Sequence, residues 1–251
     1  MMIDYQKKTL VALPHLDDEF ALVPIIKKIN SDSKDELHII YCAERNQSEE
    51  LNEKRRKESI KSLNILGCKN ANIIYLNDFF KVDDLKLHET SMKIYIFLLD
   101  FLKRKNINQI ITLNFEGGHP DHDSLALIIK KISNVNENIN SFFVPAYNGG
   151  RSKIFPISVF RPLKSQDKYF HKETFGFFAW FNAVLIALQY KSERGAFIKL
   201  MPFIILKIIF SKSIYISQKI NINSVNWSNS LSLKRYSVHI NDILCKIDSI
   251  Q

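Results

Sequence analysis

The sequence predicts an α/β protein whose mostly parallel, Rossmann-like sheet is covered by helices on both faces. Short apolar runs alternate with amphipathic helical stretches through residues 8–145, a pattern typical of a parallel sheet buried between helices. Two polar stretches, residues 14–19 and 117–123, each follow one of these runs. The carboxyl ends of parallel strands are where such sheets bind ligands, so we expect both stretches at one edge of the sheet.

The elements of this sheet follow from hydrophobic periodicity and from helix end signals. Strands are expected at residues 8–13, 37–43, 71–76, 109–115 and 139–145. Helices are expected at residues 18–28, 48–66, 90–105 and 122–133. Acids at the start of the first helix favour that end through the helix dipole. Gly67 suits the position just beyond the end of the second helix.

After residue 150 the alternation is lost. Residues 175–189 and 196–210 are apolar and aromatic, but neither reaches the roughly 20 uninterrupted apolar residues that span a bilayer. We expect helices there, and we assign no structure to residues 213–250. The chain is therefore divided into a Rossmann-like core, residues 1–150, and a mainly helical or mixed lobe, residues 151–251, packed on it. A single structural domain is the alternative.

Composition narrows the functional classes. A hydrophobic content of 46% supports a buried core and argues against disorder. Three cysteines, Cys42, Cys68 and Cys245, form no even-numbered disulfide framework and lack the spacing of a zinc ribbon. The first residues lack the apolar segment and cleavage site of a signal peptide. We therefore expect a reduced, cytoplasmic setting.

The positive charge is concentrated in the second part of the chain. Residues 151–251 carry 15 Lys and Arg against 5 Asp and Glu, whereas residues 1–150 carry 20 against 21. This asymmetry favours an anionic partner, such as a phosphate-bearing substrate, a membrane surface or a nucleic acid. A basic surface that only aids solubility is the other interpretation.

The two polar stretches have the composition of a metal site. His15 and Asp18 lie on one turn, and His119 and His122 are three residues apart at a loop-to-helix junction. A catalytic zinc keeps three protein ligands and one open position. Asp17, next to a candidate ligand, is placed to accept a proton from water. Taken alone, each stretch also suits a helix cap or packing histidines. Because both stretches lie at strand ends, we interpret them together as the metal site of a zinc hydrolase.

Three motifs, in order, resemble those of a known enzyme family. They are PHLDDE at residues 14–19, RRKE at residues 55–58 followed by Leu66-Gly67, and GGHPDHD at residues 117–123. The sequence over about residues 8–145 resembles the PIG-L/LmbE-type zinc-dependent deacetylases, which remove N-acetyl groups from glucosamine-type sugars. The resemblance implies one zinc ion per chain, held by His15, Asp18 and His122, and a general base at Asp17.

The resemblance also implies roles for three further residues. His119 would stabilise the oxyanion and protonate the leaving amine, and Asp121 would orient His119. Arg55 would contact substrate hydroxyl or phosphate groups. The implied substrate is an N-acetylated amino sugar or glycoconjugate, linked in some members to phosphate or lipid.

The sequence departs from the family pattern in three places. Leu16 replaces the more usual proline, and Gly117 stands where some members have an aromatic residue, for which Tyr147 is a candidate substitute. Beyond residue 150, Tyr190-Lys191-Ser192-Glu193 is a faint echo of the family's Y-x-S-Q segment.

Other functional classes remain open at this stage. A metal-dependent phosphoesterase would use similar residues, although two-metal phosphoesterases need more carboxylates. A non-catalytic carbohydrate-binding protein on the same fold is a third class. No nucleic-acid partner is expected. The apolar helices with their flanking lysines suit either core packing or peripheral contact with an anionic membrane. The sequence indicates no oligomeric state.

Overall fold

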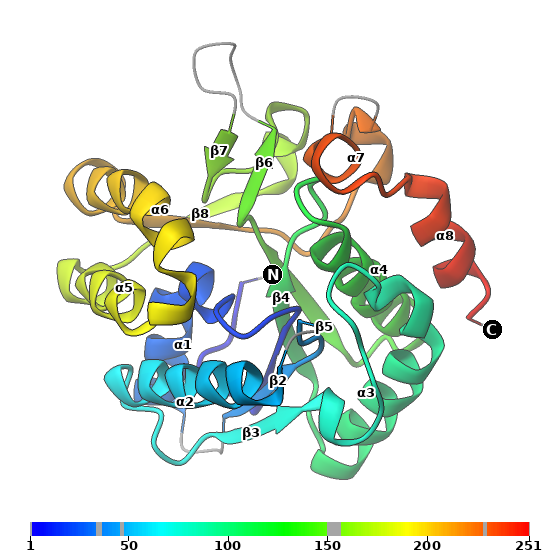
Figure 1. Cartoon of the computed structure of the whole chain (residues 1–251), viewed down its shortest axis with the longest axis horizontal. Helices are drawn as coiled ribbons and strands as arrows, with labels where there is room; N and C mark the ends of the chain where they lie inside the picture. The colour runs from blue at the N-terminus through cyan, green and yellow to red at the C-terminus, as the bar shows by residue number, and fades with distance from the viewer. Residues whose placement is uncertain (1, 34–36, 46–47, 150–156, 228–229, 251) are drawn as a thin grey trace.

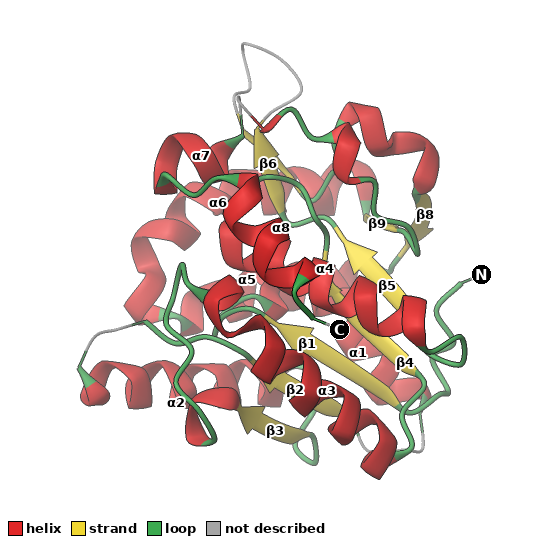
Figure 2. Ribbon diagram, turned by 90° about the vertical axis from the view of Figure 1, so that its right-hand side faces the viewer, coloured by secondary structure: helices red, strands yellow, loops and turns green. Residues whose placement is uncertain are grey.

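The centre of the protein is a five-stranded, all-parallel sheet with the strand order β3-β2-β1-β4-β5 (Figures 1 and 2). This computed structural model describes residues 2–33, 37–45, 48–149, 157–227 and 230–250. The strands are β1 (Thr9–Leu13), β2 (His38–Tyr41), β3 (Asn72–Tyr75), β4 (Gln109–Leu113) and β5 (Asn140–Val144). All five predicted strands are present, and the predicted fold class is confirmed.

Helices cover both faces of the sheet (Figure 1). They are α1 (Glu19–Asp32), α2 (Glu49–Ile65), α3 (Ser91–Lys105) and α4 (Pro120–Val135). Successive strand residues point to opposite faces, so Val11 and Leu13 join the core with α1 and α2. Leu10 and Ala12 join the core with α3 and α4. The continuous apolar runs of the sequence follow from this double burial.

Strands β1 and β4 are neighbours, and the chain leaves them towards opposite sides of the sheet. From β1 it continues outward through β2 to β3, and from β4 it continues to β5. At such a reversal of strand order the two following loops diverge and leave a crevice at the carboxyl edge. The two predicted motifs are those two loops, residues 14–18 after β1 and residues 114–119 after β4.

The ends of the helices follow local capping chemistry. Ser48 caps α2 by accepting a hydrogen bond from the Leu51 N–H, and Gly67 adopts φ +82° just after it. Helix α4 begins at Pro120, two residues earlier than predicted. Its N-cap is His119, whose Nδ1 accepts from the Asp121 N–H, and proline is favoured at a first helical position because it needs no hydrogen-bonded N–H.

The second part of the chain, where it is described, adds two strand pairs and four helices to this frame. The pairs are the antiparallel β6 (Tyr147–Gly149) with β7 (Ile157–Val159), and β8 (His171–Thr174) with β9 (Ser213–Ile216). The helices are α5 (Phe177–Gln189), α6 (Arg194–Leu206), α7 (Leu231–Tyr236) and α8 (Ile240–Asp248). The sequence did not predict these strands, which have only three or four residues each.

The predicted apolar helices are α5 and α6, although α6 ends at Leu206 and continues as a π-helical turn, Lys207–Ser211. Helix α5 packs against α1 and α2, whereas α8 packs against α3 and α4 (Figure 1). Trp180 of α5 lies in the same buried cluster as Val11 of β1. The division at residue 150 stays a prediction, and residues 150–156 lie outside the described part. Among the described helices, none is long and apolar enough to cross a membrane.

Candidate active site

The loop after β1 is closed by one of its own carboxylates. The His15 N–H donates a 2.8 Å hydrogen bond to Asp18 Oδ2, and the Asp17 N–H donates to the His15 carbonyl. These bonds hold the loop in a tight turn before α1 begins at Glu19. The His15 and Asp18 side chains therefore leave the loop on the same side, as their spacing predicted.

The loop after β4 is held by Asp123, whose carboxylate accepts from the N–H groups of Glu116 and Gly117 at 2.7 and 3.0 Å. The glycine pair is needed for two different reasons. Gly117 has φ +67°, a left-handed conformation that favours glycine. A Cβ on Gly118 would lie 2.0 Å from the Tyr147 carbonyl oxygen. Gly118 thus lets β6 approach the loop, and Tyr147 reaches the site.

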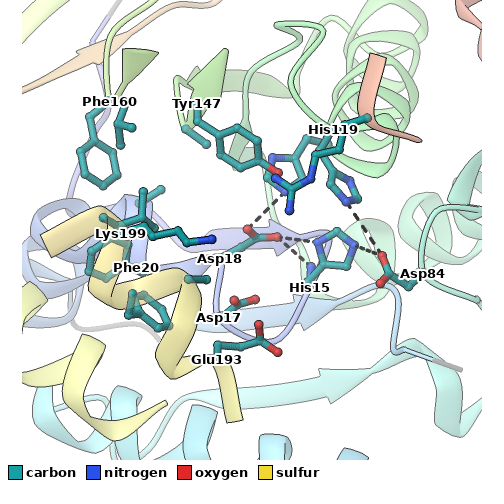
Figure 3. A pocket seen from close by; sticks show the side chains of 18 of the residues that line it. His15, Asp17, Asp18, Phe20, Asp84, His119, Tyr147, Phe160, Glu193 and Lys199 are labelled. Carbon is teal, nitrogen blue, oxygen red and sulfur yellow. Dashed lines mark hydrogen bonds and ion pairs between the residues drawn. The ribbon is translucent and has the colours of Figure 1, made fainter. Parts of the chain in front are cut away.

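The two loops bring three histidine rings together. The ring centroid of His15 lies 4.8 Å from that of His119 and 5.5 Å from that of His122, and the last two are 5.0 Å apart. Each ring offers a nitrogen within 4.8 Å of the others. Residues separated by a hundred positions in the sequence therefore form one cluster (Figure 3).

The Asp18 carboxylate lies between two of these rings. Asp18 Oδ2 is 3.2 Å from His15 Nδ1, and Oδ1 is 3.3 Å from His122 Nε2. Ligand atoms around tetrahedral zinc with bonds of about 2.0–2.1 Å are roughly 3.3–3.4 Å apart. His15, Asp18 and His122 therefore have the donor types that suit a zinc ion, with one Asp18 oxygen close to each histidine. Among the described residues, the groups whose ligand atoms all lie within 4.8 Å of one another are His15, His119 and His122, and His15, Asp84 and Asp121. Burial opposes ionisation of Asp18, but the two histidines hold its pKa below the usual range.

Two further carboxylates approach the other nitrogen of His15. His15 Nε2 is 2.9 Å from Asp121 Oδ2 and 3.2 Å from Asp84 Oδ1. Burial alone would lower the pKa of His15, but the hydrogen bonds with Asp121, Asp18 and Asp84 raise it well above the usual value. A carboxylate behind a metal-ligating histidine fixes its tautomer and orientation. Asp121 is placed to do this for His15.

This placement differs from the expected orienting role of Asp121. Its side chain is fully buried, and besides His15 it accepts from the N–H groups of Leu85 and Leu87 at 2.7 and 3.0 Å. Only its backbone N–H reaches His119, at Nδ1. The reason is the N-cap geometry: a histidine at the N-cap bonds the backbone two residues on, and the Asp121 side chain then points away.

Asp17 lies on the opposite side of Asp18 from the histidines, with its side chain 24% exposed at the base of the pocket. Arg55 Nη2 lies 3.5 Å from Asp17 Oδ1. Loss of water around the Asp17 carboxyl raises its pKa to about 8, and the Asp18 charge adds to the rise while Arg55 opposes it. A carboxyl with a raised pKa is suited to exchanging protons near neutral pH.

Arg55 is more enclosed than the sequence predicted for a substrate contact. Its side chain is only 4% exposed and donates to Glu193 Oε1 at 2.8 Å and to the Leu16 carbonyl. Arg45, whose side chain is 39% exposed, shares Glu193 at 2.6 Å and approaches Asp84 at 3.5 Å. Arg55 still lines the pocket, together with Arg45 and Lys199.

The site occupies one end of a pocket of about 510 Å³. The polar end holds the histidines, Asp17, Asp18 and Asp84. On the other side of the pocket lie Phe20 and Phe160, with Lys199 between them (Figure 3), and the lining also includes Phe197 and Leu200. Such a pocket can take a ligand that has both polar and apolar parts.

His119 and Tyr147 line the same pocket as His15 and Asp18. The pKa of His119 is held well below its usual value by burial and by the charges of His15 and His122. The centroid of its ring lies 4.7 Å from that of Tyr236. Tyr147, the candidate aromatic substitute, lies with its ring 5.4 Å from that of His122. The sequence had no signal for Tyr236, Asp84 or Arg45, because each lies outside any recognisable motif.

The Tyr190–Glu193 segment, noted only as a faint echo, ties the second part of the chain to the motifs of the first. The Tyr190 hydroxyl donates to Glu19, the last residue of PHLDDE. Ser192 donates to Glu58. Glu193 in turn accepts from Arg55, the first arginine of RRKE. The three contacts hold the Tyr190–Glu193 segment against residues that flank the site.

We expect Tyr190→Phe to destabilise the protein in a pH-dependent way. Burial raises the pKa of Glu19 to about 6 against the hydrogen bonds that lower it. Because this pKa lies above the unfolded value, the cost of the Glu19 charge grows as the pH rises through about 6. Removing the Tyr190 hydroxyl should therefore lower the unfolding free energy by about 1 kcal/mol at acid pH and about 2–3 kcal/mol in alkaline buffer.

Urea unfolding on both sides of that pKa measures this difference. The matched control is Tyr75→Phe, because the Tyr75 hydroxyl contacts Ser59 at 3.3 Å instead of Glu19. If Tyr190→Phe lowers the unfolding free energy by the same amount at both pH values, the Tyr190 hydroxyl does not stabilise the charge of Glu19 and the prediction is refuted.

Comparisons with known proteins find a matching family model and several similar folds. The PIG-L family model, described as GlcNAc-PI de-N-acetylase, matches residues 10–133. No curated protein sequence matches the chain significantly.

Several solved structures have a similar fold. A deacetylase from teicoplanin biosynthesis, in complex with teicoplanin, is 11% identical with a TM-score of 0.57, covering 86% of this chain and 100% of that one. The N,N'-diacetylchitobiose deacetylase from Pyrococcus horikoshii is 19% identical with a TM-score of 0.52, covering 79% and 75%. The conserved protein TT1542 from Thermus thermophilus is 16% identical with a TM-score of 0.53, covering 86% and 96%. At these identities the likeness concerns the fold. The segment that carries the three motifs, residues 10–133, belongs to the PIG-L family.

Proposed function

We propose that this protein is a zinc-dependent deacetylase that hydrolyses the N-acetyl group of an amino sugar or glycoconjugate. The observation that carries the proposal is the Asp18 carboxylate lying 3.2–3.3 Å from His15 and His122, with Asp17 beside it at the base of a pocket. The family match and the deacetylases among the structural neighbours support the same reaction class.

The donor set fits one zinc ion. His15, Asp18 and His122 would hold it, and Asp121 would keep His15 in the right tautomer through the 2.9 Å contact with Nε2. Bound zinc would supply a Lewis acid that polarises the acetyl carbonyl and lowers the pKa of a nearby water. Three protein ligands leave a fourth position for water or substrate.

The remaining chemistry belongs to the side chains around the cluster. Asp17 would take the proton of the attacking water in its deprotonated form, which a nearby zinc charge would favour. His119, which lines the same pocket, would donate a hydrogen bond to the developing oxyanion and, in the protonated form that its lowered pKa makes less populated, would protonate the leaving amine. Amide hydrolysis needs both a base and an acid, and these two residues come from the two different loops.

The cations in the pocket define the class of substrate further. The pocket is lined by three cations, Arg45, Arg55 and Lys199. Arg45 is partly exposed to solvent and Lys199 is exposed. These groups would bind sugar hydroxyls or a phosphate, while the apolar side chains of the pocket would accept an acyl or lipid portion. We propose a phosphate- or lipid-linked sugar as substrate and the cytoplasm as location.

Metal analysis and an amine-release assay test the proposal together. Purified protein should hold about one zinc ion per chain and release acetate and a free amine from N-acetylglucosamine conjugates. Chelation should abolish this activity and added zinc should restore it. Asp18→Asn should lose metal and activity, whereas Asp32→Asn, at the exposed end of the same helix, should keep both. Cleavage of phosphate esters without amine release would contradict the proposal.

A further inference from the structure

An unusual share of the exposed apolar surface lies on one segment. Of the 15 large hydrophobic side chains that are exposed in the described part of the chain, nine fall between residues 177 and 210. We call these nine the apolar face. They are Phe177, Phe178, Phe181, Leu188, Ile198, Ile205, Leu206, Ile209 and Phe210. Soluble monomers rarely expose large contiguous apolar patches, and such patches mark interaction sites.

Helix periodicity explains why these side chains are not used in the core. In α5, Trp180, Ala183 and Ala187 are buried against the rest of the protein. Phe177, Phe181 and Leu188 lie on the other side of the helix, with Phe181 four and Leu188 eleven residues after Phe177. An ordinary surface helix carries polar residues on that side, but α5 has no charged residue at all. Its apolar surface therefore exceeds what core packing requires.

Helix α6 and the π-helical turn after it continue this surface. Ile198, Ile205 and Ile209 are seven and four residues apart and are all exposed. Helices α5 and α6 pack side by side and form one lateral side of the molecule, away from α7 and α8 (Figure 1). The most exposed side chains are Phe178 at 75% and Phe210 at 79%. The apolar face thus has members on two helices that pack against each other.

The charges on the segment that carries the apolar face are almost all positive, although Glu50 and Glu53 of α2 lie beside Lys191. Residues 175–212 contain five basic residues and one acid, Glu193. Glu193 is buried and paired with Arg45 and Arg55, so it offers no negative charge at the surface. Lys191 and Arg194 are exposed, and the side chain of Lys199 points into the pocket. An apolar helical face bordered by lysine and arginine is the pattern of helices that lie in an anionic membrane interface.

The same charges disfavour a second copy of the chain as the occupant. A symmetric dimer places the same patch on both subunits, which would bring two sets of these cations together. An anionic lipid bilayer instead offers an apolar layer to the apolar face and negative head groups to the cations that border it. We propose that the apolar face is a docking surface for an anionic lipid bilayer, with α5, α6 and the π-helical turn lying in the interface.

This docking would place the pocket next to the membrane. Phe197 and Leu200 of α6 line the pocket, whereas Ile198 of the same helix is exposed in the apolar face. Helix α6 therefore contributes both to the lining of the pocket and to the proposed interface. The proposal itself concerns binding and does not require the deacetylase activity.

Flotation of the purified full chain with vesicles tests the docking. The protein should float with vesicles of phosphatidylcholine and phosphatidylserine, and much less with phosphatidylcholine alone, and high salt should weaken the binding. The double variant Phe178→Ser with Phe210→Ser should lower the bound fraction roughly tenfold or more. Lys191→Gln with Arg194→Gln should lower it severalfold.

The matched control is Ile96→Ser with Val135→Ser, which changes two side chains that are 58% and 64% exposed on the other side of the sheet. This variant should float like the unchanged protein, and melting curves should show that all variants are folded. Failure of the unchanged protein to bind anionic vesicles would overturn the proposal. So would equal binding to neutral vesicles, or full binding by the Phe178 and Phe210 variant. A dimer that this variant abolishes, without vesicle binding, would assign the face to self-association instead.

Discussion

Replacing Asp17 with asparagine is expected to reduce amide hydrolysis by about 10²–10⁴-fold, the range for loss of a general base. The side chain keeps its size, but an amide does not accept a proton at neutral pH. Asp17 is adjacent to the proposed ligand Asp18, yet it lies on the Arg55 side of the pocket. Zinc content should therefore stay at the level of the unchanged protein. The measurements are kcat on an N-acetylated sugar conjugate and metal content of the same sample.

The metal-free protein offers an independent check on the same residue. Burial and the Asp18 charge raise the pKa of Asp17 to about 8, so the folded state favours the protonated form. Stability from this group is fully present below the unfolded pKa and is lost as the pH rises through about 8. Metal-free Asp17→Asn protein should therefore be more stable than the unchanged protein in alkaline buffer, with the difference shrinking towards acid pH.

Asp32→Asn is the control for both measurements. Asp32 is at the other end of α1, where its carboxylate pairs with Lys28, and its replacement should alter neither activity nor the stability in alkaline buffer. Undiminished hydrolysis by Asp17→Asn protein would remove Asp17 from the mechanism. If the loss of hydrolysis is explained entirely by lost zinc, Asp17 acts in metal binding and not as the base.

The second large effect is expected from Asp121→Asn. The Asp121 carboxylate is fully buried and accepts three hydrogen bonds, from His15 and from the N–H groups of Leu85 and Leu87. Carboxylates behind a ligating histidine contribute 10–100-fold to metal affinity. We expect zinc affinity to fall by about that factor. We also expect the unfolding free energy to fall by about 1–3 kcal/mol. The NH2 group of the asparagine would face at least one of the donors that now bind the Asp121 carboxylate, and that donor would lose its acceptor.

Asp123→Asn is the matched control for this variant. Asp123 is also fully buried in the first turn of α4, but the hydrogen bonds of its carboxylate go to the loop N–H groups of Glu116 and Gly117. Its replacement should cost similar stability and much less zinc affinity. A competition titration with a zinc chelator compares the two. Equal zinc affinity in both variants would show that the His15 contact has no tuning role.

The local structure of the core was largely predictable. The apolar runs that predicted β1 and β4 are double-faced strands in the structure, and residues such as Leu10 and Val11 alternate between the two cores. The His15 and Asp18 pair leaves its turn on one side because four residues of loop allow little else. Helix α4 begins two residues earlier than predicted, because its start is set by the N-cap His119 and by Pro120 at the first helical position, which hydrophobic periodicity does not detect.

Other parts of the site could not be predicted from local pattern. Asp84, Arg45 and Tyr236 reach the pocket from three different segments, and none lies in a motif or a periodic stretch. The contact of Asp121 with His15 joins residues 106 positions apart. Such contacts depend on the path of loops between elements, and loop paths are set by long-range packing.

The sequence by itself determined the strands, the helices of the core and the two loops that carry the chemistry, because hydrophobic periodicity and capping act over a few residues. Tertiary structure alone decided which carboxylate faces which nitrogen of His15, how deeply Arg55 is enclosed, and that the Tyr190–Glu193 segment packs on the motifs. It also decided that α5 and α6 turn an apolar side outward. These features depend on which surfaces meet, and an apolar helix has the same sequence pattern whether its second face is covered or exposed.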